Sequence, residues 1–194
     1  MTPARTAGVL RCERGALVAW LGLLTALLAI GAVALSTAQA FTGRQAPDLA
    51  GTAWINSEPL SVQSLRGSVV LVEFWTFGCF NCRNVEPQVK AWHERYADQG
   101  LVVVGVHTPE FAYEKDTAAV TRYVGDHDIR YPVITDNAYT IWNSYGNHYW
   151  PAMYLIDKRG TIRYVRVGEG GYDETEGMIQ TLLAETLAPP EGHQ

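Results

Sequence analysis

The sequence predicts an α/β domain with a mixed central sheet. Residues 68–74 and 101–106 are almost uninterrupted apolar runs, which are typical of strands covered on both faces of a sheet. Segments with helical spacing of apolar residues follow both runs. The turn at residues 157–160 then joins two strand-like segments, and a last helix follows them. Strands that alternate with helices and end in a hairpin and a helix indicate a mixed sheet.

The first half of the domain is predicted to hold a hairpin, a strand and a long helix. Residues 41–67 place turn-forming Gly and Pro between short strand-like pieces, so we expect an N-terminal β-hairpin extension there. The strand at residues 68–74 leads into a helix that runs from Cys79 to about Gln99. Pro87 is expected to kink this helix and Gly100 to end it. The apolar face of the helix has spacings of four, three and four residues: Val85, Val89, Trp92 and Tyr96.

The second half is predicted to alternate strands and helices. One helix, at residues 116–126, is inserted after the strand at residues 101–106. The other elements are a strand at 129–135, a short helix at 139–145, strands at 152–156 and 161–167, and a helix at 172–187.

The N-terminus has the parts of an export signal. Arg5, Arg11 and Arg14 precede an uncharged run at residues 16–35, and small residues follow as far as Ala40. The run is also long enough to span a bilayer core of ~30 Å. Residues 1–40 are therefore predicted to be a signal peptide or an N-terminal membrane anchor, which places the following domain outside the cytoplasm, in the periplasm or an equivalent compartment.

The charge of the domain excludes two classes of partner. The whole chain has a formal net charge of −5, and residues 1–40 contain three arginines and one glutamate, so the remainder carries −7. An acidic surface without a basic run argues against nucleic-acid binding and against binding to anionic lipids. Contact with a membrane is expected only through residues 1–40, if they are not cleaved.

Two cysteines point to redox chemistry. Cys12 lies before the apolar run, so the exported part holds only Cys79 and Cys82. Two cysteines cannot fill a four-ligand zinc site, and one close pair does not staple a scaffold; we expect no metal and no cofactor. A Cys-x-x-Cys pair at a helix start, after a buried strand, is typical of thiol–disulfide exchange. The helix N-terminus stabilises a thiolate at Cys79, the predicted nucleophile, and Cys82 is the resolving thiol.

The order of elements and several motifs resemble the thioredoxin fold. Phe74-Trp75 lies just before Cys79-Phe80-Asn81-Cys82, and Trp150-Pro151-Ala152 precedes a strand as the cis-proline of that family does. The extension and the inserted helix resemble the exported TlpA-like branch. Segments 106–111, 149–152 and 168–172 are similar to the thioredoxin-like domain of DipZ-type cytochrome c biogenesis proteins. The resemblance implies a thioredoxin-like domain at 41–188, a tail at 189–194, and a separate membrane protein that supplies electrons.

Further residues acquire roles from their positions. Glu73 lies in an apolar strand, and a buried carboxylate with a raised pKa there can exchange a proton with Cys82. The resemblance implies that Pro151 follows a cis peptide, and that Trp150 and Pro151 form the substrate platform. Weaker candidates for the surroundings of the site, or for its substrate contacts, are Trp75, Phe80, Asn81, His107, Glu110, Glu169 and Tyr172.

Three functions remain open. The first is a thiol–disulfide oxidoreductase of the cell envelope, in particular a reductase of exported protein disulfides. The second is a peroxidase of peroxiredoxin type, because Thr76-Phe77-Gly78-Cys79 fits a Thr-x-x-Cys pattern, although no proline precedes Thr76. The third is a binding module that uses the groove at Trp150 without catalysis.

Overall fold

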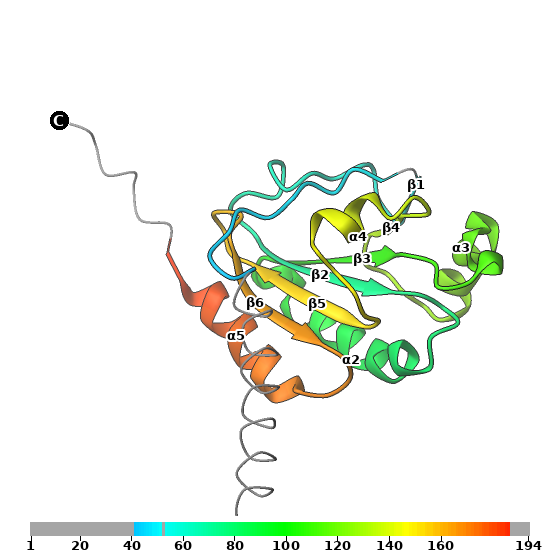
Figure 1. Cartoon of the computed structure of the whole chain (residues 1–194). Coiled ribbons are helices and arrows are strands. Elements are labelled where there is room, and N and C mark those ends of the chain that lie inside the picture. Colours follow the sequence, from blue (N-terminus) through cyan, green and yellow to red (C-terminus); the bar gives the residue numbers. More distant parts are fainter. Residues whose placement is uncertain (1–40, 52, 187–194) are drawn as a thin grey trace, which may run out of the picture. The chain divides into compact units, whose positions relative to one another are not determined.

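A computed structural model describes residues 41–51 and 53–186, which form a six-stranded sheet flanked by helices (Figure 1). The strand order is β1-β4-β3-β2-β5-β6. The strands are β1 (Ala53–Ile55), β2 (Val69–Trp75), β3 (Leu101–His107), β4 (Val133–Thr135), β5 (Ala152–Ile156) and β6 (Ile162–Val167). The helices are α2 (Phe80–Tyr96), α3 (Thr117–Asp126), α4 (Thr140–Ser144) and α5 (Tyr172–Ala184).

The sheet is mixed, as the sequence predicts. Strands β2, β3 and β4 are parallel to one another, whereas β1, β5 and β6 pair antiparallel with their neighbours. Strand β2 is buried along its whole length because β3 and β5 pair with its two edges and packed side chains cover both of its faces. Its C-terminal residue, Trp75, pairs with His107, so the segment that leads to Cys79 leaves the sheet beside the end of β3.

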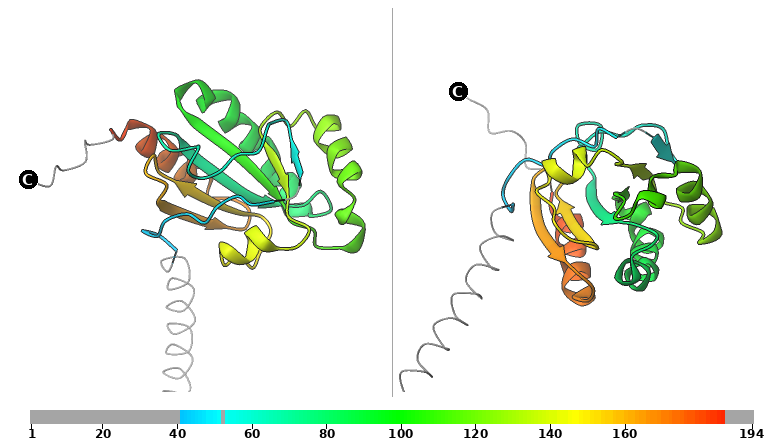
Figure 2. Two further views of the ribbon diagram at one scale, coloured as in Figure 1. Left: turned by 90° about the horizontal axis from the view of Figure 1, so that it is seen from above. Right: turned by 45° about the vertical axis from the view of Figure 1, so that its right-hand side comes forward.

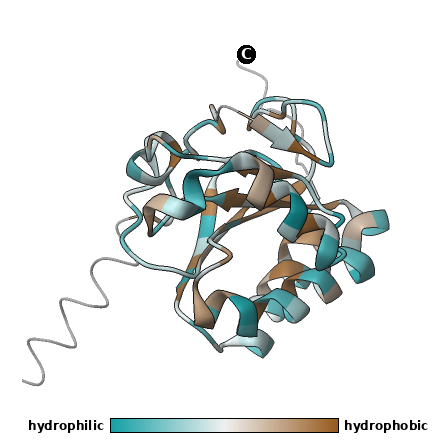
Figure 3. Cartoon of the chain, turned by 90° about the vertical axis from the view of Figure 1, so that its right-hand side faces the viewer, coloured by the Kyte–Doolittle hydropathy of each residue, from teal (hydrophilic) through white to brown (hydrophobic). Residues whose placement is uncertain are grey.

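Two layers cover the sheet (Figures 1 and 2). Buried residues of α2, α3 and α5 pack on one face, and α4 together with the N-terminal segment packs on the other. Strand β2 contributes to both cores because successive side chains point to opposite faces. Figure 3 shows the strands as mostly hydrophobic and the helices as hydrophobic on one side only, as burial of one helix face requires.

The C-terminal half of α2 is fixed to α5 by one carboxylate. Glu176 accepts hydrogen bonds from Trp92 Nε1 (3.2 Å) and Tyr96 Oη (2.6 Å), and it forms an ion pair with Arg95. These contacts fix the C-terminal end of α2, which is the end remote from the cysteines.

The N-terminal segment differs from the expected β-hairpin. Residues 53–55 form β1, which pairs with β4, and Gln45 forms an isolated bridge with Thr161 beside the other end of the sheet. Each edge of the sheet offers unpaired backbone groups, and the segment covers both edges instead of pairing with itself. The hairpin prediction is therefore wrong, although its residues do extend the sheet.

The helices agree more closely with the sequence. Helix α2 begins one residue after Cys79, contains Pro87, and continues into a 3₁₀ turn, Ala97–Gln99, that ends at Gly100 with a φ of 99°. The inserted helix α3 is confirmed. Within residues 41–51 and 53–186, no helix is both long and apolar enough to cross a bilayer. The predicted signal peptide or anchor, and the tail at 189–194, lie outside the described residues.

Candidate active site

The two cysteines occupy the first turn of α2. Cys79 is the N-cap residue and Cys82 lies one turn further; a disulfide joins them, with a Cα–Cα distance of 5.3 Å. The Cys82 N–H donates to Cys79 Sγ at 3.2 Å. Cys82 is only 3% exposed, whereas Cys79 is partly exposed. This difference gives the two sulfurs distinct access to an incoming molecule, and the positive end of the helix faces the accessible sulfur.

Glu73 lies buried in the middle of β2, with 2% of its surface exposed. Burial raises its pKa to about 8; the negative charge of Glu86 adds to this effect, and a hydrogen bond from Tyr131 Oη (3.4 Å) opposes it. By the alternation of side chains along β2, Glu73 shares a face of the sheet with Val69, Leu71 and Trp75, which pack in the same core as Cys82. The Glu73 carboxyl is therefore neutral at pH 7 for most of the time. It lies on the same face of the sheet as Cys82.

An aromatic group packs beneath the loop that carries Cys79. The Trp75 ring is buried, edge-on to His107 and near Tyr123. His107 is also fully buried, stacks on Phe77, and its Nε2 lies 3.2 Å from Thr76 Oγ1. Burial lowers the pKa of His107 to about 4, so its imidazole is neutral at pH 7. His107 is thus a buried neutral group at the end of β3.

A groove of about 410 Å³ opens beside Cys79. Trp150 forms one wall and is held by a hydrogen bond from its Nε1 to Thr108 O (2.9 Å) and by its ring against Trp142. The Trp150–Pro151 peptide bond is cis. The groove is lined by Gly78, Cys79, Phe80, Asn81, Glu110, His148, Tyr149 and Trp150.

The structure brings most of the predicted site residues together. Five of them line the groove (Cys79, Phe80, Asn81, Glu110 and Trp150), Pro151 directly follows Trp150, and Cys82, Glu73 and Trp75 are buried. Glu169 does not line the groove; its carboxylate accepts a hydrogen bond from Asn84 Nδ2 (3.1 Å) on α2. Tyr172 packs against Trp92, as a core residue does.

Two carboxylates near the site were not found from the sequence. Glu86 accepts hydrogen bonds from Tyr123 Oη (2.8 Å) and pairs with His127 Nδ1 (3.0 Å). It lies four residues after Cys82, and this helical spacing was the signal that could have revealed it. Glu114 is fully buried and accepts the N–H of Gly78 at 2.9 Å. Its position in a short 3₁₀ helix, Ala112–Lys115, gave no such signal.

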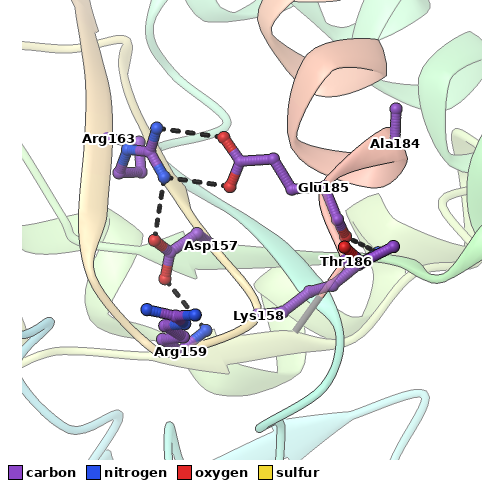
Figure 4. A pocket seen from close by; sticks show the side chains of 7 residues that line it. All are labelled: Asp157, Lys158, Arg159, Arg163, Ala184, Glu185 and Thr186. Atoms are coloured by element: carbon purple, nitrogen blue, oxygen red, sulfur yellow. Dashed lines mark hydrogen bonds and ion pairs between the residues drawn. The ribbon is translucent and has the colours of Figure 1, made fainter. Parts of the chain in front are cut away.

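A second pocket lies at the opposite end of the sheet (Figure 4). Ile156, at the end of β5, pairs with Val70 at the start of β2, so the following turn is far along the sheet from Cys79. The cations here serve the fold: Lys158 donates to backbone carbonyls at the end of α5, and Arg163 bridges Asp157 and Glu185. The lining residues are Asp157, Lys158, Arg159, Arg163, Ala184, Glu185 and Thr186.

Among the residues that the structure describes, no group of three or more His, Cys, Asp or Glu side chains is placed to hold a metal ion.

Known proteins resemble the chain in sequence and in fold. The chain is 47% identical over 142 residues to Protein DipZ of Mycobacterium bovis and of Mycobacterium tuberculosis; the match covers 71% of the chain but only 20% of those proteins. Thiol-disulfide oxidoreductase YkuV of Bacillus subtilis is 33% identical over 141 residues, covering 72% of the chain and 95% of YkuV. The solution structure of a thioredoxin-like protein in the oxidized form aligns with a TM-score of 0.67 and 32% identity, covering 74% of this chain and 97% of that one.

These comparisons confirm the resemblance that the motifs suggest. The model of the AhpC/TSA family matches residues 42–165, which include the cysteines, the groove and most of the sheet. The chain spans about a fifth of the length of the DipZ proteins, so the match concerns one part of them. On these grounds the chain belongs to the AhpC/TSA family and has a thioredoxin-like fold.

Proposed function

We propose that the chain is a thiol–disulfide oxidoreductase of the cell envelope that works as a reductase. The observation that carries this proposal is the disulfide at the N-terminus of α2, with Cys79 open to the groove and Cys82 buried on the Glu73 side of the sheet. The name of YkuV, a thiol-disulfide oxidoreductase that matches along nearly its whole length, supports the same chemistry.

The reaction begins with the reduced pair. The Cys79 thiolate attacks one sulfur of a substrate disulfide, a mixed disulfide forms, and the other substrate sulfur leaves as a thiolate. Cys82 then loses its proton and attacks Cys79 Sγ, which closes the Cys79–Cys82 disulfide and releases the second substrate thiolate. Two electrons pass from the protein to the substrate, whose two sulfurs end as thiols.

Glu73 is the proposed proton acceptor for Cys82. A thiol buried in apolar surroundings is a poor nucleophile until its proton is removed. The pKa of the Glu73 carboxyl, about 8, is close to the ordinary pKa of a thiol, about 8.5. A proton can therefore move in either direction between Glu73 and Cys82 at little cost in free energy. The same group can return a proton to Cys82 when the disulfide is reduced again.

The groove is the proposed substrate site. Phe80 and Asn81 lie next to the nucleophile, and Phe80 exposes 68% of its surface. Trp150 lines the same groove, and its backbone, which precedes the cis bond to Pro151, is the proposed pairing site for an extended polypeptide. Trp75 supports the loop from below, while Glu169 acts indirectly through its bond with Asn84.

The cellular setting is also part of the proposal. Residues 1–40 export or anchor a domain that comprises residues 41–188 and is followed by a tail at 189–194. A reductase in an oxidising compartment needs electrons from elsewhere, so we infer a membrane protein as electron donor. Apocytochromes and other exported proteins with disulfides are the expected substrates, in line with the DipZ-type resemblance and a role in cytochrome c biogenesis.

A reduction assay tests the proposal. Reduced protein should reduce insulin disulfides, the C79S variant should not, and a redox potential near roughly −270 mV would indicate a reductase whereas roughly −120 mV would indicate an oxidant. Rapid peroxide consumption without insulin reduction would support the peroxidase instead. A C79S/C82S variant that keeps full cellular activity would support the non-catalytic binding module.

The peroxidase alternative has less support in the geometry. A peroxidatic cysteine needs the Thr76 hydroxyl to be directed toward its sulfur. In the structure this hydroxyl is fully buried and lies 3.2 Å from His107 Nε2, while the Thr76 carbonyl accepts the Cys79 N–H at 3.3 Å.

A further inference from the structure

Glu114 is a buried carboxylate that the exchange reaction described above does not use. It lies in the 3₁₀ helix Ala112–Lys115, and none of its surface is exposed. Its hydrogen-bond donors are three backbone N–H groups. Oε1 accepts from Gly78 at 2.9 Å, and Oε2 accepts from Glu110 at 2.6 Å and from Phe111 at 2.8 Å. Three N–H donors suit the ionised carboxylate, which has only acceptors.

The contact with Gly78 is tight and adjoins the nucleophile. A Cβ atom at Gly78 would lie 2.2 Å from Glu114 Oε1 and 2.5 Å from Tyr113 Oη, so residue 78 has no room for a side chain. Gly78 immediately precedes Cys79 and lines the same groove. The carboxylate therefore joins the loop that follows β3 to the backbone from which Cys79 projects.

We propose that Glu114 is a positioning residue for the thiol–disulfide pair: it fixes the backbone before Cys79, and its charge makes the pair more strongly reducing. The inference rests on the proposed function, because it concerns the direction in which that pair passes electrons.

The sign of the effect follows from electrostatics. In the reduced protein Cys79 is the group that carries negative charge, whereas the disulfide is neutral. A carboxylate close to Cys79 raises the free energy of the thiolate but not that of the disulfide. Glu114 thus disfavours the reduced form, which gives up its electrons more readily. The N-terminus of α2 has the opposite effect, because it stabilises the thiolate.

Other groups also act on Cys79. His107, on the far side of the loop, is neutral at pH 7 because burial lowers its pKa to about 4. The titratable or charged groups on the surrounding elements include Arg83 and Glu86 on α2, Tyr113 on the 3₁₀ helix, and Glu110, His148 and Tyr149 in the groove. Glu73 on β2 is neutral at pH 7 for most of the time, because burial raises its pKa to about 8. Glu110 is exposed, so water screens its charge more than that of Glu114.

Substitution of Glu114 separates charge from shape in the full-length chain. E114Q removes the charge and keeps one oxygen, which can still accept a hydrogen bond. E114D keeps the charge on a shorter side chain, and E58Q makes the same chemical change at an exposed carboxylate outside the groove. The readouts are the equilibrium constant of the pair with glutathione and the pH profile of Cys79 alkylation.

We expect E114Q to shift the equilibrium with glutathione about tenfold toward the reduced protein, which corresponds to about 30 mV for a two-electron couple. The pH midpoint of Cys79 alkylation should fall by about one unit in the same variant. E114D should stay within about threefold of the parent protein, and E58Q within about twofold. An unchanged equilibrium constant in E114Q, or an equal shift in E114D and E114Q, would overturn the inference.

A measurement on the parent protein covers the case in which E114Q does not fold. The Gly78, Glu110 and Phe111 amides should be protected from hydrogen exchange in the reduced protein, and exchange at the rate of open loops would also overturn the inference. A parent protein that fails to reduce insulin would instead contradict the proposed function, because the equilibrium constant and the exchange rates can be measured without any substrate.

Discussion

The pKa of Glu73 leads to a prediction about stability. Its value of about 8 in the folded protein exceeds its ordinary value of 4.5, so between these pH values the folded state holds a proton that the unfolded state has lost. Raising the pH through this range therefore favours unfolding, by up to ~1.36 kcal/mol per pH unit, whereas below pH 4.5 both states are protonated and the effect is constant. The E73Q variant cannot ionise, and its amide oxygen can still accept the hydrogen bond from Tyr131.

Urea unfolding of the oxidised parent and of E73Q, at a series of pH values, measures this effect. All other titratable groups are common to both proteins, so the difference between their free energies of unfolding isolates Glu73. E73Q should gain about 2.5 kcal/mol relative to the parent between pH 5.5 and pH 7.5, and the gain should level off above pH 8. A difference that stays constant over this range would refute the view that Glu73 is held neutral by burial.

Three further predictions concern the site. C82S should accumulate a mixed disulfide between Cys79 and its substrate, visible on a non-reducing gel, because the resolving thiol is absent; C79S should form none. Y131F removes a hydrogen bond that lowers the pKa of Glu73, so this pKa should be higher in the variant than in the parent. In urea unfolding, the loss of stability caused by Glu73 should therefore continue to a higher pH in Y131F. W150A removes a wall of the groove, and the KM for a peptide disulfide should rise about tenfold with a smaller change in kcat, in steady-state assays; an unchanged KM would remove Trp150 from the substrate site.

Local patterns in the sequence were sufficient for most of the fold. The apolar runs that became β2 and β3 could be read directly, because a strand covered on both faces has no polar side. The segment before β2 was misjudged because its partners lie elsewhere in the chain: β1 pairs with β4, and Gln45 bridges to Thr161. Pairing between distant segments leaves no periodic signal in either of them.

The residues of the site also fall into those that local spacing predicts and those that it does not. Cys79, Cys82 and Glu73 lie within ten residues of one another, at the end of a strand and the start of a helix, so their spacing was informative. Glu114 comes 35 residues after Cys79, and it reaches the site through a backbone hydrogen bond to Gly78, which no residue pattern records. The predicted strand ends at residue 106, whereas β3 extends one residue further, to His107, which is buried.

The attachment of α2 to α5 separates Trp92 from two tryptophans that lie near the disulfide. Trp92 is fully buried and its Nε1 is bonded to Glu176, near the end of α2 remote from the cysteines. Its emission should form a constant background as the disulfide opens and closes. Trp75 packs in the core beside Cys82, and Trp150 lines the groove with Cys79. Disulfides and thiolates quench indoles over short distances, so these two rings make the redox state of the protein optically readable without an added label.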